Sequence, residues 1–281
     1  MNEENKKLNG EWSHINGAGW SYLLRYQPQF ADKCDWSKLD GGDWVRLLVA
    51  RVEFADRCDW GKLDGFNWCL LLCDQPRFAD KCDWSKLDGD NWASLLFSRP
   101  QFAEHCDWSK LDGKNWAHLS RSFNWFAFEG KCDWSKLDGS DWFSVVTAHP
   151  QYAELCDWGK LNAINWAFTL DCHVEWIDKC DWSKLNGTCW LGLVDRWPDL
   201  AEKCDMSKIT GESILRLVGA KDHRPIVALA HRVRECDFST LTALEWCELL
   251  AVRPDLVDKF EDSSHDWEAD GNEESPGVEA G

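Results

Sequence analysis

The tripeptide Cys-Asp-Trp recurs along this chain at a nearly constant interval. It begins at seven positions: Cys34, Cys58, Cys82, Cys106, Cys132, Cys156 and Cys180. Cys204-Asp205-Met206 and Cys236-Asp237-Phe238 continue the series, and a degenerate first copy starts at Gly10. Successive copies lie 24 residues apart, except for 26 residues after Cys106 and 32 after Cys204. A fixed period of this length is typical of a solenoid, in which each repeat stacks on the next.

The copy that begins at Cys82 shows how one repeat is expected to fold. Asp88 is a typical N-cap residue, and Trp92 opens an apolar stripe at helical spacing that predicts a helix of about ten residues. Pro100 ends that helix and can begin a second, shorter helix. Asp107 is then expected to cap a single 3₁₀-like turn before the next repeat starts.

A single repeat cannot bury its apolar side, whereas stacked repeats can. We therefore expect an all-α fold, an elongated and curved solenoid of about ten 24-residue repeats, each with two short helices and a 3₁₀-like turn. The solenoid should cover residues 10–260, with irregular repeats at 106–131 and 204–235, after an N-terminal extension at 1–9. Residues 261–281 hold eight acidic residues and neither Lys nor Arg, which predicts a disordered acidic tail.

The repeat resembles that of bacterial tandem-repeat proteins built on the pattern Cys-Asp-Trp-x-Lys-Leu-x-Gly-x-x-Trp, and this resemblance covers nearly the whole chain. The period is also similar to that of the leucine-rich-repeat variant, which implies repeats that pair an α-helix with a 3₁₀ helix. Neither resemblance supplies catalytic residues that could be assigned to this sequence.

Tryptophan is unusually frequent, with 21 residues, and the repeat places most of them in two columns. The first column follows the Cys-Asp pair: Trp36, Trp60, Trp84, Trp108, Trp134, Trp158 and Trp182. The second lies on the expected helix: Trp20, Trp44, Trp68, Trp92, Trp116, Trp142, Trp166, Trp190 and Trp246. Because residues that are identical in every repeat are those that stacking requires, we expect both columns in the core. Five tryptophans fall outside the columns: Trp12, Trp125, Trp176, Trp197 and Trp267.

The identical cysteines and charged residues also have structural interpretations. Packed helices lie about 9–10 Å apart, whereas a disulfide needs Cα atoms within about 7 Å, so successive column cysteines should not bridge. Cys69 with Cys73, and Cys172 beside His173, lack the second pair of ligands that a metal site needs. The aspartate that follows each column cysteine should cap a turn, with a weak ion pair to the lysine three residues later.

Charge and motifs exclude several classes of function. The net charge of −18 repels phosphate backbones, so nucleic acid is not an expected ligand. No apolar run is long enough to span a membrane, and the N-terminus lacks a secretory signal, which favours a cytoplasmic protein with free thiols. The sequence contains no nucleophile elbow, zinc-protease, Walker or dinucleotide-binding motif, so we expect neither enzymatic activity nor a cofactor.

Recognition is expected where the repeat varies. Variable pairs follow each second-column tryptophan: Val45-Arg46, Cys69-Leu70, Ala93-Ser94, Ala117-His118, Phe143-Ser144, Ala167-Phe168 and Leu191-Gly192. Variable single residues precede the proline position: Arg51, Gln75, Arg99, His149, His173 and Trp197. These positions change in size and charge, as a recognition surface would, although relaxed constraint at solvent-facing positions explains them equally well.

The two irregular repeats add candidate partner-binding residues. The repeat at 106–131 replaces the proline segment with an aromatic cluster that includes Trp125, Phe126 and Phe128. The repeat at 204–235 carries a basic island, which we define as Lys221, His223, Arg224, His231, Arg232 and Arg234. With Trp197, the candidate residues are Trp125, Phe126, Phe128, Lys221, Arg224, Arg232 and Arg234. The basic island could hold an acidic partner or the chain's own acidic tail.

The leading hypothesis is a non-catalytic scaffold that binds one or more proteins through its variable, solvent-facing positions. Two alternatives remain open at this stage. One is a carbohydrate-binding module that uses exposed tryptophans, and the other is an acidic inhibitor that mimics nucleic acid.

Overall fold

The structure, a computed structural model, describes residues 12–220 and 223–262 of the 281-residue chain. The described residues are helical and contain no β-strand. The expected N-terminal extension at 1–9, nearly all of the expected tail and Lys221 lie outside these residues. Among the described residues, no helix is long and apolar enough to cross a membrane. The chain divides into two compact units, Met1–Glu154 and Leu155–Gly281, which we call the N-terminal and C-terminal units.

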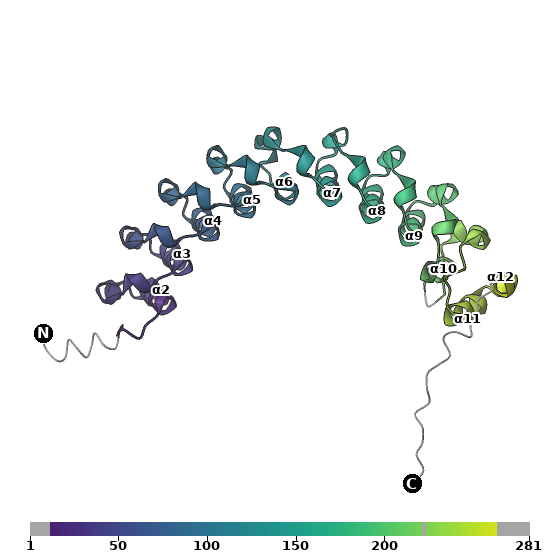
Figure 1. The fold of residues 1–281 in the computed structure, drawn as a ribbon, viewed down its shortest axis with the longest axis horizontal. Coiled ribbons are helices and arrows are strands. Elements are labelled where there is room, and N and C mark those ends of the chain that lie inside the picture. The colour runs from purple at the N-terminus through teal and green to yellow at the C-terminus, as the bar shows by residue number, and fades with distance from the viewer. Residues whose placement is uncertain (1–11, 221–222, 263–281) are drawn as a thin grey trace, which may run out of the picture. The chain divides into compact units, whose positions relative to one another are not determined.

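The N-terminal unit is a stack of α-helices that lie side by side, with 3₁₀ helices beside them (Figure 1). Its α-helices are α2 (Gly17–Tyr26), α3 (Gly41–Ala50), α4 (Gly65–Asp74), α5 (Gly89–Ser98), α6 (Gly113–Ser120) and α7 (Gly139–Ala148). The 3₁₀ helices after the α-helices are η1 (Pro28–Lys33), η3 (Val52–Arg57), η5 (Pro76–Lys81), η7 (Pro100–His105), η9 (Trp125–Ala127), η10 (Glu129–Lys131) and η12 (Pro150–Tyr152). Short 3₁₀ turns precede the α-helices: η2 (Trp36–Lys38), η4 (Trp60–Lys62), η6 (Trp84–Lys86), η8 (Trp108–Lys110) and η11 (Trp134–Lys136).

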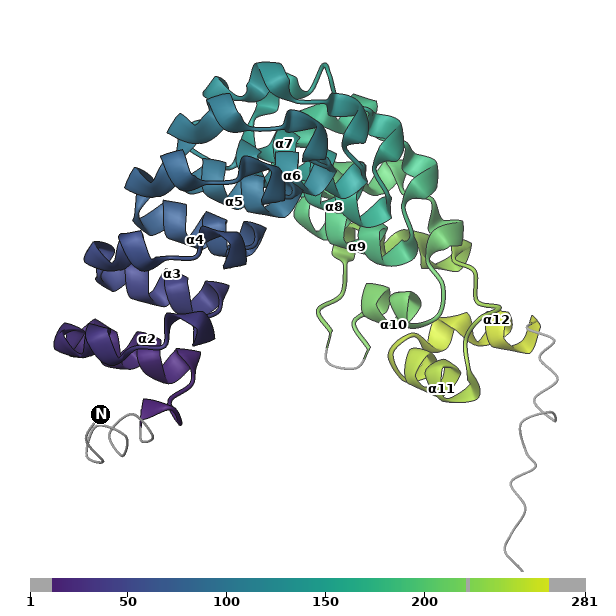
Figure 2. The same ribbon diagram turned by 60° about the vertical axis from the view of Figure 1, so that its left-hand side comes forward.

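The C-terminal unit repeats the same arrangement and is seen from a second side in Figure 2. Its α-helices are α8 (Ala163–Cys172), α9 (Gly187–Arg196), α10 (Glu212–Val218), α11 (Ala243–Val252) and α12 (Val257–Asp262). Its 3₁₀ helices are η13 (Trp158–Lys160), η14 (Val174–Lys179), η15 (Trp182–Lys184), η16 (Pro198–Lys203), η17 (Met206–Lys208), η18 (Val227–Glu235) and η19 (Pro254–Leu256). Within the described residues, α2–α11 supply one α-helix for each of the ten expected repeats, which confirms the all-α repeat solenoid.

The repeat that begins at Cys82 starts and ends its α-helix where the sequence predicts. The Asp88 side chain accepts a hydrogen bond from the backbone N–H of Asn91 at 2.8 Å and caps α5. Arg99 leaves the helical conformation, and Pro100 starts the next segment. That segment, η7, is a 3₁₀ helix, in which the N–H of Phe102 bonds to the carbonyl of Arg99 three residues earlier. Six residues allow few of the longer α-helical bonds, which explains the tighter form.

The aspartate that follows the column cysteine caps the short 3₁₀ turn, as expected, in the repeats from Cys34 to Cys204 except at Asp157, whose side chain makes no capping hydrogen bond. The carboxylate of Asp83 accepts hydrogen bonds from the backbone N–H of Ser85 at 3.2 Å and from its hydroxyl at 2.6 Å. These two bonds hold the pKa of Asp83 below its usual value. The same pair of bonds recurs at Asp35, Asp107, Asp133, Asp181 and Asp205.

The two tryptophan columns differ in burial, and the prediction that both are core is correct in full only for the second. Every second-column tryptophan is at most 1 % exposed. First-column tryptophans are half-buried, because each lays one face on its buried neighbour. The rings of Trp84 and Trp92 are stacked, with centroids 5.5 Å apart, and Phe102 tilts against Trp84 at the same distance. Trp12 stacks on Trp20 in the same way, as expected for a degenerate first repeat.

In most repeats the lysine of the 3₁₀ turn bonds to backbone carbonyls of the preceding repeat, which the sequence did not predict. Lys86 Nζ donates to the backbone carbonyls of Gly61 at 3.0 Å and Leu63 at 2.6 Å. Lys38, Lys62, Lys110, Lys136 and Lys184 make the equivalent pair of bonds. This column, which we call the lysine ladder, corrects the expected ion pair and links successive repeats through charged hydrogen bonds.

We expect Lys86→Met to lower the free energy of unfolding by about 2 kcal/mol, because the partly buried bond to the Leu63 carbonyl and the exposed bond to the Gly61 carbonyl are both lost. Lys81→Met is the matched control. Lys81 lies on the surface beside Asp80, at 3.1 Å, and an exposed pair of this kind contributes at most about 1 kcal/mol. Denaturant unfolding followed by far-UV circular dichroism measures both changes. Equal effects for the two variants would contradict the structural role of the ladder.

A glycine begins most of the α-helices because the next repeat comes very close at that point. A Cβ atom added at Gly89 would lie less than 3.0 Å from the backbone carbonyl oxygen of Lys110 and from the side chain of Asn115. The same approach occurs at Gly17, Gly41, Gly65, Gly113 and Gly187, each against the lysine carbonyl of the following repeat. Glycine is therefore needed at this position because it lets the repeats pack closely, and not because the backbone adopts an unusual conformation there.

The third helical position holds Asn in several repeats and a buried aspartate in two. Asp141 is 6 % exposed, and its carboxylate accepts a hydrogen bond from the backbone N–H of Asp138 at 3.0 Å. Burial raises the pKa of Asp141, and the charges of Asp138 and Asp112 raise it further. Asn115 makes the same capping bond without a charge.

Asp141→Asn is therefore expected to stabilise the protein at pH 7. A carboxyl group whose pKa is raised on folding costs stability once the pH exceeds that folded pKa, because its ionised form is then buried. The gain should shrink to nothing as the pH falls through the folded pKa, where Asp141 itself becomes neutral. The midpoint of thermal unfolding, measured between pH 3 and pH 8, follows this change.

Asp43→Asn provides the control for this prediction. The Asp43 carboxylate occupies the same position in α3 but accepts a hydrogen bond from Arg46 Nη2 at 2.6 Å. Its charge is compensated, so the same substitution should bring no gain. An equal stabilisation of the two variants would contradict the electrostatic explanation.

The described cysteines are free thiols, as expected. Burial raises the pKa of the column thiols, for example of Cys58, Cys82 and Cys106 to about 12. These residues act as small apolar side chains between repeats. On α4, a hydrogen bond from Cys69 lowers the pKa of Cys73 to about 7.

The irregular repeats rebuild the core with different residues. In the repeat at 106–131, Trp125 is fully buried and donates a hydrogen bond from Nε1 to the hydroxyl of Tyr152 at 3.0 Å. Phe128 takes the usual phenylalanine position beside Trp108. In the repeat at 204–235, α10 ends at Gly219 with φ +80°, and η18 is a 3₁₀ helix of nine residues. Elsewhere Trp176 occupies the phenylalanine position, 5.4 Å from Trp158.

Candidate functional site

The exposed face of the α-helices carries most of the large apolar side chains that the stack leaves in solvent. Of 14 such side chains among the described residues, nine lie on α2–α11: Tyr22, Tyr26, Phe66, Leu70, Phe97, Ile164, Phe168, Leu244 and Val252. Charge is sparse on the same face, since the exposed charged residues of α3–α5 are Arg46, Asp74 and Asp90. We call this side of the α-helices, taken in each unit by itself, the α-face.

Of each variable pair that follows a second-column tryptophan, mainly the second residue lies on the α-face. The second residue of each pair is exposed or half-buried, as at Arg46, Leu70 and Phe168, whereas the first is buried or half-buried. Helical geometry explains this, because the residue after a buried tryptophan turns toward the neighbouring helix and the next one turns to solvent.

The variable residues before the proline position lie at the end of each α-helix and bond mainly to the preceding repeat. Arg99 donates to the carbonyl of Cys73 at 2.8 and 2.5 Å, and Gln75 donates to the carbonyl of Val49 at 3.0 Å. Arg51 bonds to Arg25, and His149 Nε2 lies 2.5 Å from the carbonyl oxygen of Ser120. These four residues satisfy helix C-terminal carbonyls, which assigns them to stacking instead of recognition.

The aromatic cluster at 106–131 divides between core and surface. Trp125 and Phe128 are at most 1 % exposed, so neither belongs to a binding surface. Phe126 is 64 % exposed and packs edge-on against His149, and Phe123, which the sequence did not single out, is fully exposed. The pattern of aromatic residues could not show which of them would fill the core.

The basic island is not continuous in the structure. Arg232 donates to the carbonyls of Ala201 at 2.7 Å and Cys204 at 3.2 Å, and it forms an ion pair with Glu235. Arg234 bonds to the carbonyl of Asp255 and to the Asp258 carboxylate. Both residues therefore hold the C-terminal unit together. Arg224 is different, because its side chain is 85 % exposed.

Trp197 ends α9, and its ring lies 5.6 Å from the guanidinium of Arg196. The side chain of this candidate partner-binding residue is half-buried. His173 is also half-buried and stacks on Trp176 with ring centroids 4.3 Å apart.

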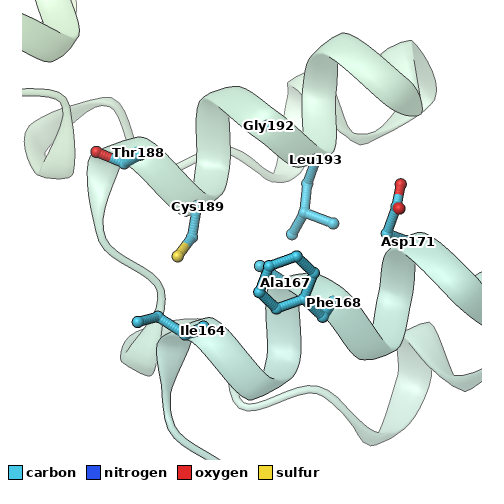
Figure 3. A pocket seen from close by; sticks show the side chains of 8 residues that line it. All are labelled: Ile164, Ala167, Phe168, Asp171, Thr188, Cys189, Gly192 and Leu193. Carbon is cyan, nitrogen blue, oxygen red and sulfur yellow. The ribbon is translucent and has the colours of Figure 1, made fainter. Parts of the chain in front are cut away.

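A groove of about 510 Å³ lies on the α-face between α8 and α9 (Figure 3). Its lining is mostly apolar: Ile164, Ala167, Phe168, Asp171, Thr188, Cys189, Gly192 and Leu193. Cys189 and Leu193 point from α9 toward α8, and Ile164 and Phe168 form the opposite wall (Figure 3). Ile164 and Phe168 are each 57 % exposed, so the groove is open to a ligand.

Two residues explain why the groove lies at this pair of helices. Gly192 has no side chain at the variable position, and a Cβ atom added there would meet nothing within 4 Å. Ala163 begins α8, whereas α2–α7 and α9 begin with Gly. Since a Cβ atom at the glycine position conflicts with the next lysine carbonyl elsewhere, we infer that Ala163 keeps the following turn farther from α8.

Two smaller polar cavities lie beside the groove. One, of about 250 Å³, is lined by Thr188, Glu212, Ser213, Arg216 and His223, so it shares Thr188 with the groove. The other, of about 210 Å³, is lined by Asp195, Arg216, His223, Arg224 and Ile226.

Comparison with protein-family models, curated proteins and solved structures finds no match to this chain. The site must therefore be interpreted from its own chemistry. Among the described residues, no group of three or more His, Cys, Asp or Glu side chains could hold a metal ion. The groove offers apolar surface and a few polar groups at one end, which is an arrangement suited to binding.

The sequence indicated part of this groove. Ala167, Phe168 and Gly192 belong to the variable pairs, whereas Ile164, Thr188 and Cys189 precede the second-column tryptophans and were not singled out. Variability was visible there too, because the residue two positions before the tryptophan changes from Phe66 to Asp90 and Lys114.

Proposed function

We propose that this chain is a non-catalytic scaffold that binds other proteins through the α-face. The observation that supports it is the concentration of exposed apolar side chains on that face, at positions that vary between repeats. Phe66, Leu70 and Phe97 lie on the neighbouring helices α4 and α5, and exposed apolar side chains gathered in this way are typical of an interaction site. On α3–α5 the exposed acidic side chains are Asp74 and Asp90, so little negative charge covers this part of the α-face.

The structure offers less support for sugar binding by a tryptophan ladder. The second column is buried, and side chains lie over some first-column rings. His105 stacks on Trp84 with centroids 4.4 Å apart, and Lys203 Nζ lies 5.6 Å from the ring centroid of Trp182. A sugar ring would have to displace these groups.

The test is affinity capture with two matched variants of the full chain. The α-face variant carries Phe66→Ser, Leu70→Ser and Phe97→Ser, at positions that are 40–62 % exposed. The control carries Asp56→Ser, Arg77→Ser and Asp80→Ser, which are exposed on the 3₁₀ helices. Proteins captured by the wild type should be lost from the α-face variant and kept by the control. Capture that survives the α-face changes, in a variant that melts as the wild type does, would contradict the proposal.

A further inference from the structure

We propose that the groove between α8 and α9 binds residues 263–281 of a second copy of this chain, with Trp267 as the anchor. The inference uses the α-face of the proposed function but names a partner that the chain itself supplies. Its failure would leave other proteins as partners of the α-face.

The groove suits one large apolar side chain. Leu193 is buried at 2 % exposure, and Phe168 and Ile164 stand beside it as partly exposed walls. Gly192 leaves the space above α9 open. A volume of about 510 Å³ accommodates an indole ring together with neighbouring backbone.

The polar cavities place arginine side chains near that anchor. Arg216, His223 and Arg224 line them, together with the acidic residues Asp195 and Glu212. Arg224 is 85 % exposed and lies 3.4 Å from Asp195, a contact that contributes little in water. Its guanidinium can therefore pair with an incoming carboxylate. At the other end of the groove Asp171 is already 3.5 Å from Arg196.

The segment 263–281 carries this combination of groups. Trp267 lies outside both tryptophan columns, so stacking of the repeats does not explain it. Asp266, Glu268 and Asp270 surround it, and the segment contains neither Lys nor Arg. A tryptophan flanked by carboxylates matches an apolar groove whose neighbouring polar cavities are lined by Arg216 and Arg224.

The length of the chain between α12 and Trp267 favours binding to the groove of a second copy over binding to the groove of the same molecule. Trp267 is five residues beyond the end of α12 at Asp262, which allows a span of at most about 18 Å. The helices α9, α10 and α11 are successive neighbours, and with a spacing of about 9–10 Å the groove lies two to three steps away. α12 packs against η19 on the 3₁₀ side, which lengthens the path further.

Sedimentation velocity of the full chain over a range of concentrations tests this inference. The wild type should associate as its concentration rises, and Trp267→Ala and Gly192→Leu should each remain monomeric. A mixture of the two variants should form a dimer, because one supplies an intact groove and the other an intact segment. Ser94→Leu places the same leucine at the equivalent position of α5, and this variant should associate as the wild type does. Arg224→Glu should weaken association at least tenfold.

Either of two results would overturn the inference. One is a wild type that stays monomeric at every concentration, including the case in which its own segment docks within the same molecule. The other is association that neither Trp267→Ala nor Gly192→Leu changes. Gly192→Leu fills open space on a helix, where Leu is favoured over Gly, so loss of folding does not complicate the result.

Discussion

Replacing Trp92 with alanine is expected to lower the free energy of unfolding by about 3–5 kcal/mol. Trp92 is completely buried, and it stacks on Trp84 within its own repeat. Alanine would leave a cavity between repeats and remove this ring contact. Denaturant unfolding followed by far-UV circular dichroism, with full-length protein, measures the loss.

Trp84→Ala is the variant with which the destabilisation of Trp92→Ala should be compared. Trp84 is half-buried, because one face rests on Trp92 and His105 covers the other. Its removal should cost about half as much, since less apolar area returns to water. A negligible cost at Trp84 would indicate a freely exposed ring and would revive a ligand-binding role for the first column. Equal costs would contradict the difference in burial between the columns.

The second large effect is expected at Gly89. Valine at this position should destabilise the protein by at least about 2 kcal/mol, because its side chain would overlap the backbone carbonyl of Lys110 in the next repeat. Backbone cannot move aside as a flexible side chain can, so the two repeats must separate. Thermal unfolding measures the loss.

Gly61→Ser is the control for Gly89→Val. Gly61 lies in a turn at the position where other repeats carry Ser37, Ser85 and Ser109. Serine there should donate its hydroxyl to Asp59, as Ser85 does to Asp83, and the stability should change by no more than about 0.5 kcal/mol. If neither substitution lowered the stability, the result would contradict the close approach of the repeats at Gly89.

The sequence predicted the repeat, its caps and its buried helix stripe, because these depend on residues close together in the chain. Asp88 caps its own helix, and Trp92 begins a stripe whose spacing is local. Contacts between repeats were harder to predict. The lysine ladder joins Lys86 to carbonyl groups 23 and 25 residues away, and its partners are backbone atoms that the side-chain pattern does not reveal.

The site was predictable only in part for a similar reason. Variable residues indicated the α-face, but the groove depends on a missing side chain at Gly192 and an added Cβ atom at Ala163, whose effect emerges only when two helices are packed. Among aromatic neighbours such as Trp125 and Phe126, burial followed from the two-residue insertion in that repeat. Arg224, Arg232 and Arg234 all belong to the basic island in the sequence, yet only the side chain of Arg224 is largely exposed.

Side-chain footprinting of the full chain, with and without a captured protein, tests the role of the α-face most directly. Hydroxyl-radical labelling reports the exposure of Phe66, Leu70, Phe97 and Phe168, which are 40–62 % exposed in the free chain. We expect protection at two or more of these side chains on binding, while the 3₁₀ residues His105 and Pro76 keep their labelling. Protection confined to the 3₁₀ helices, with an unchanged α-face, would contradict the account.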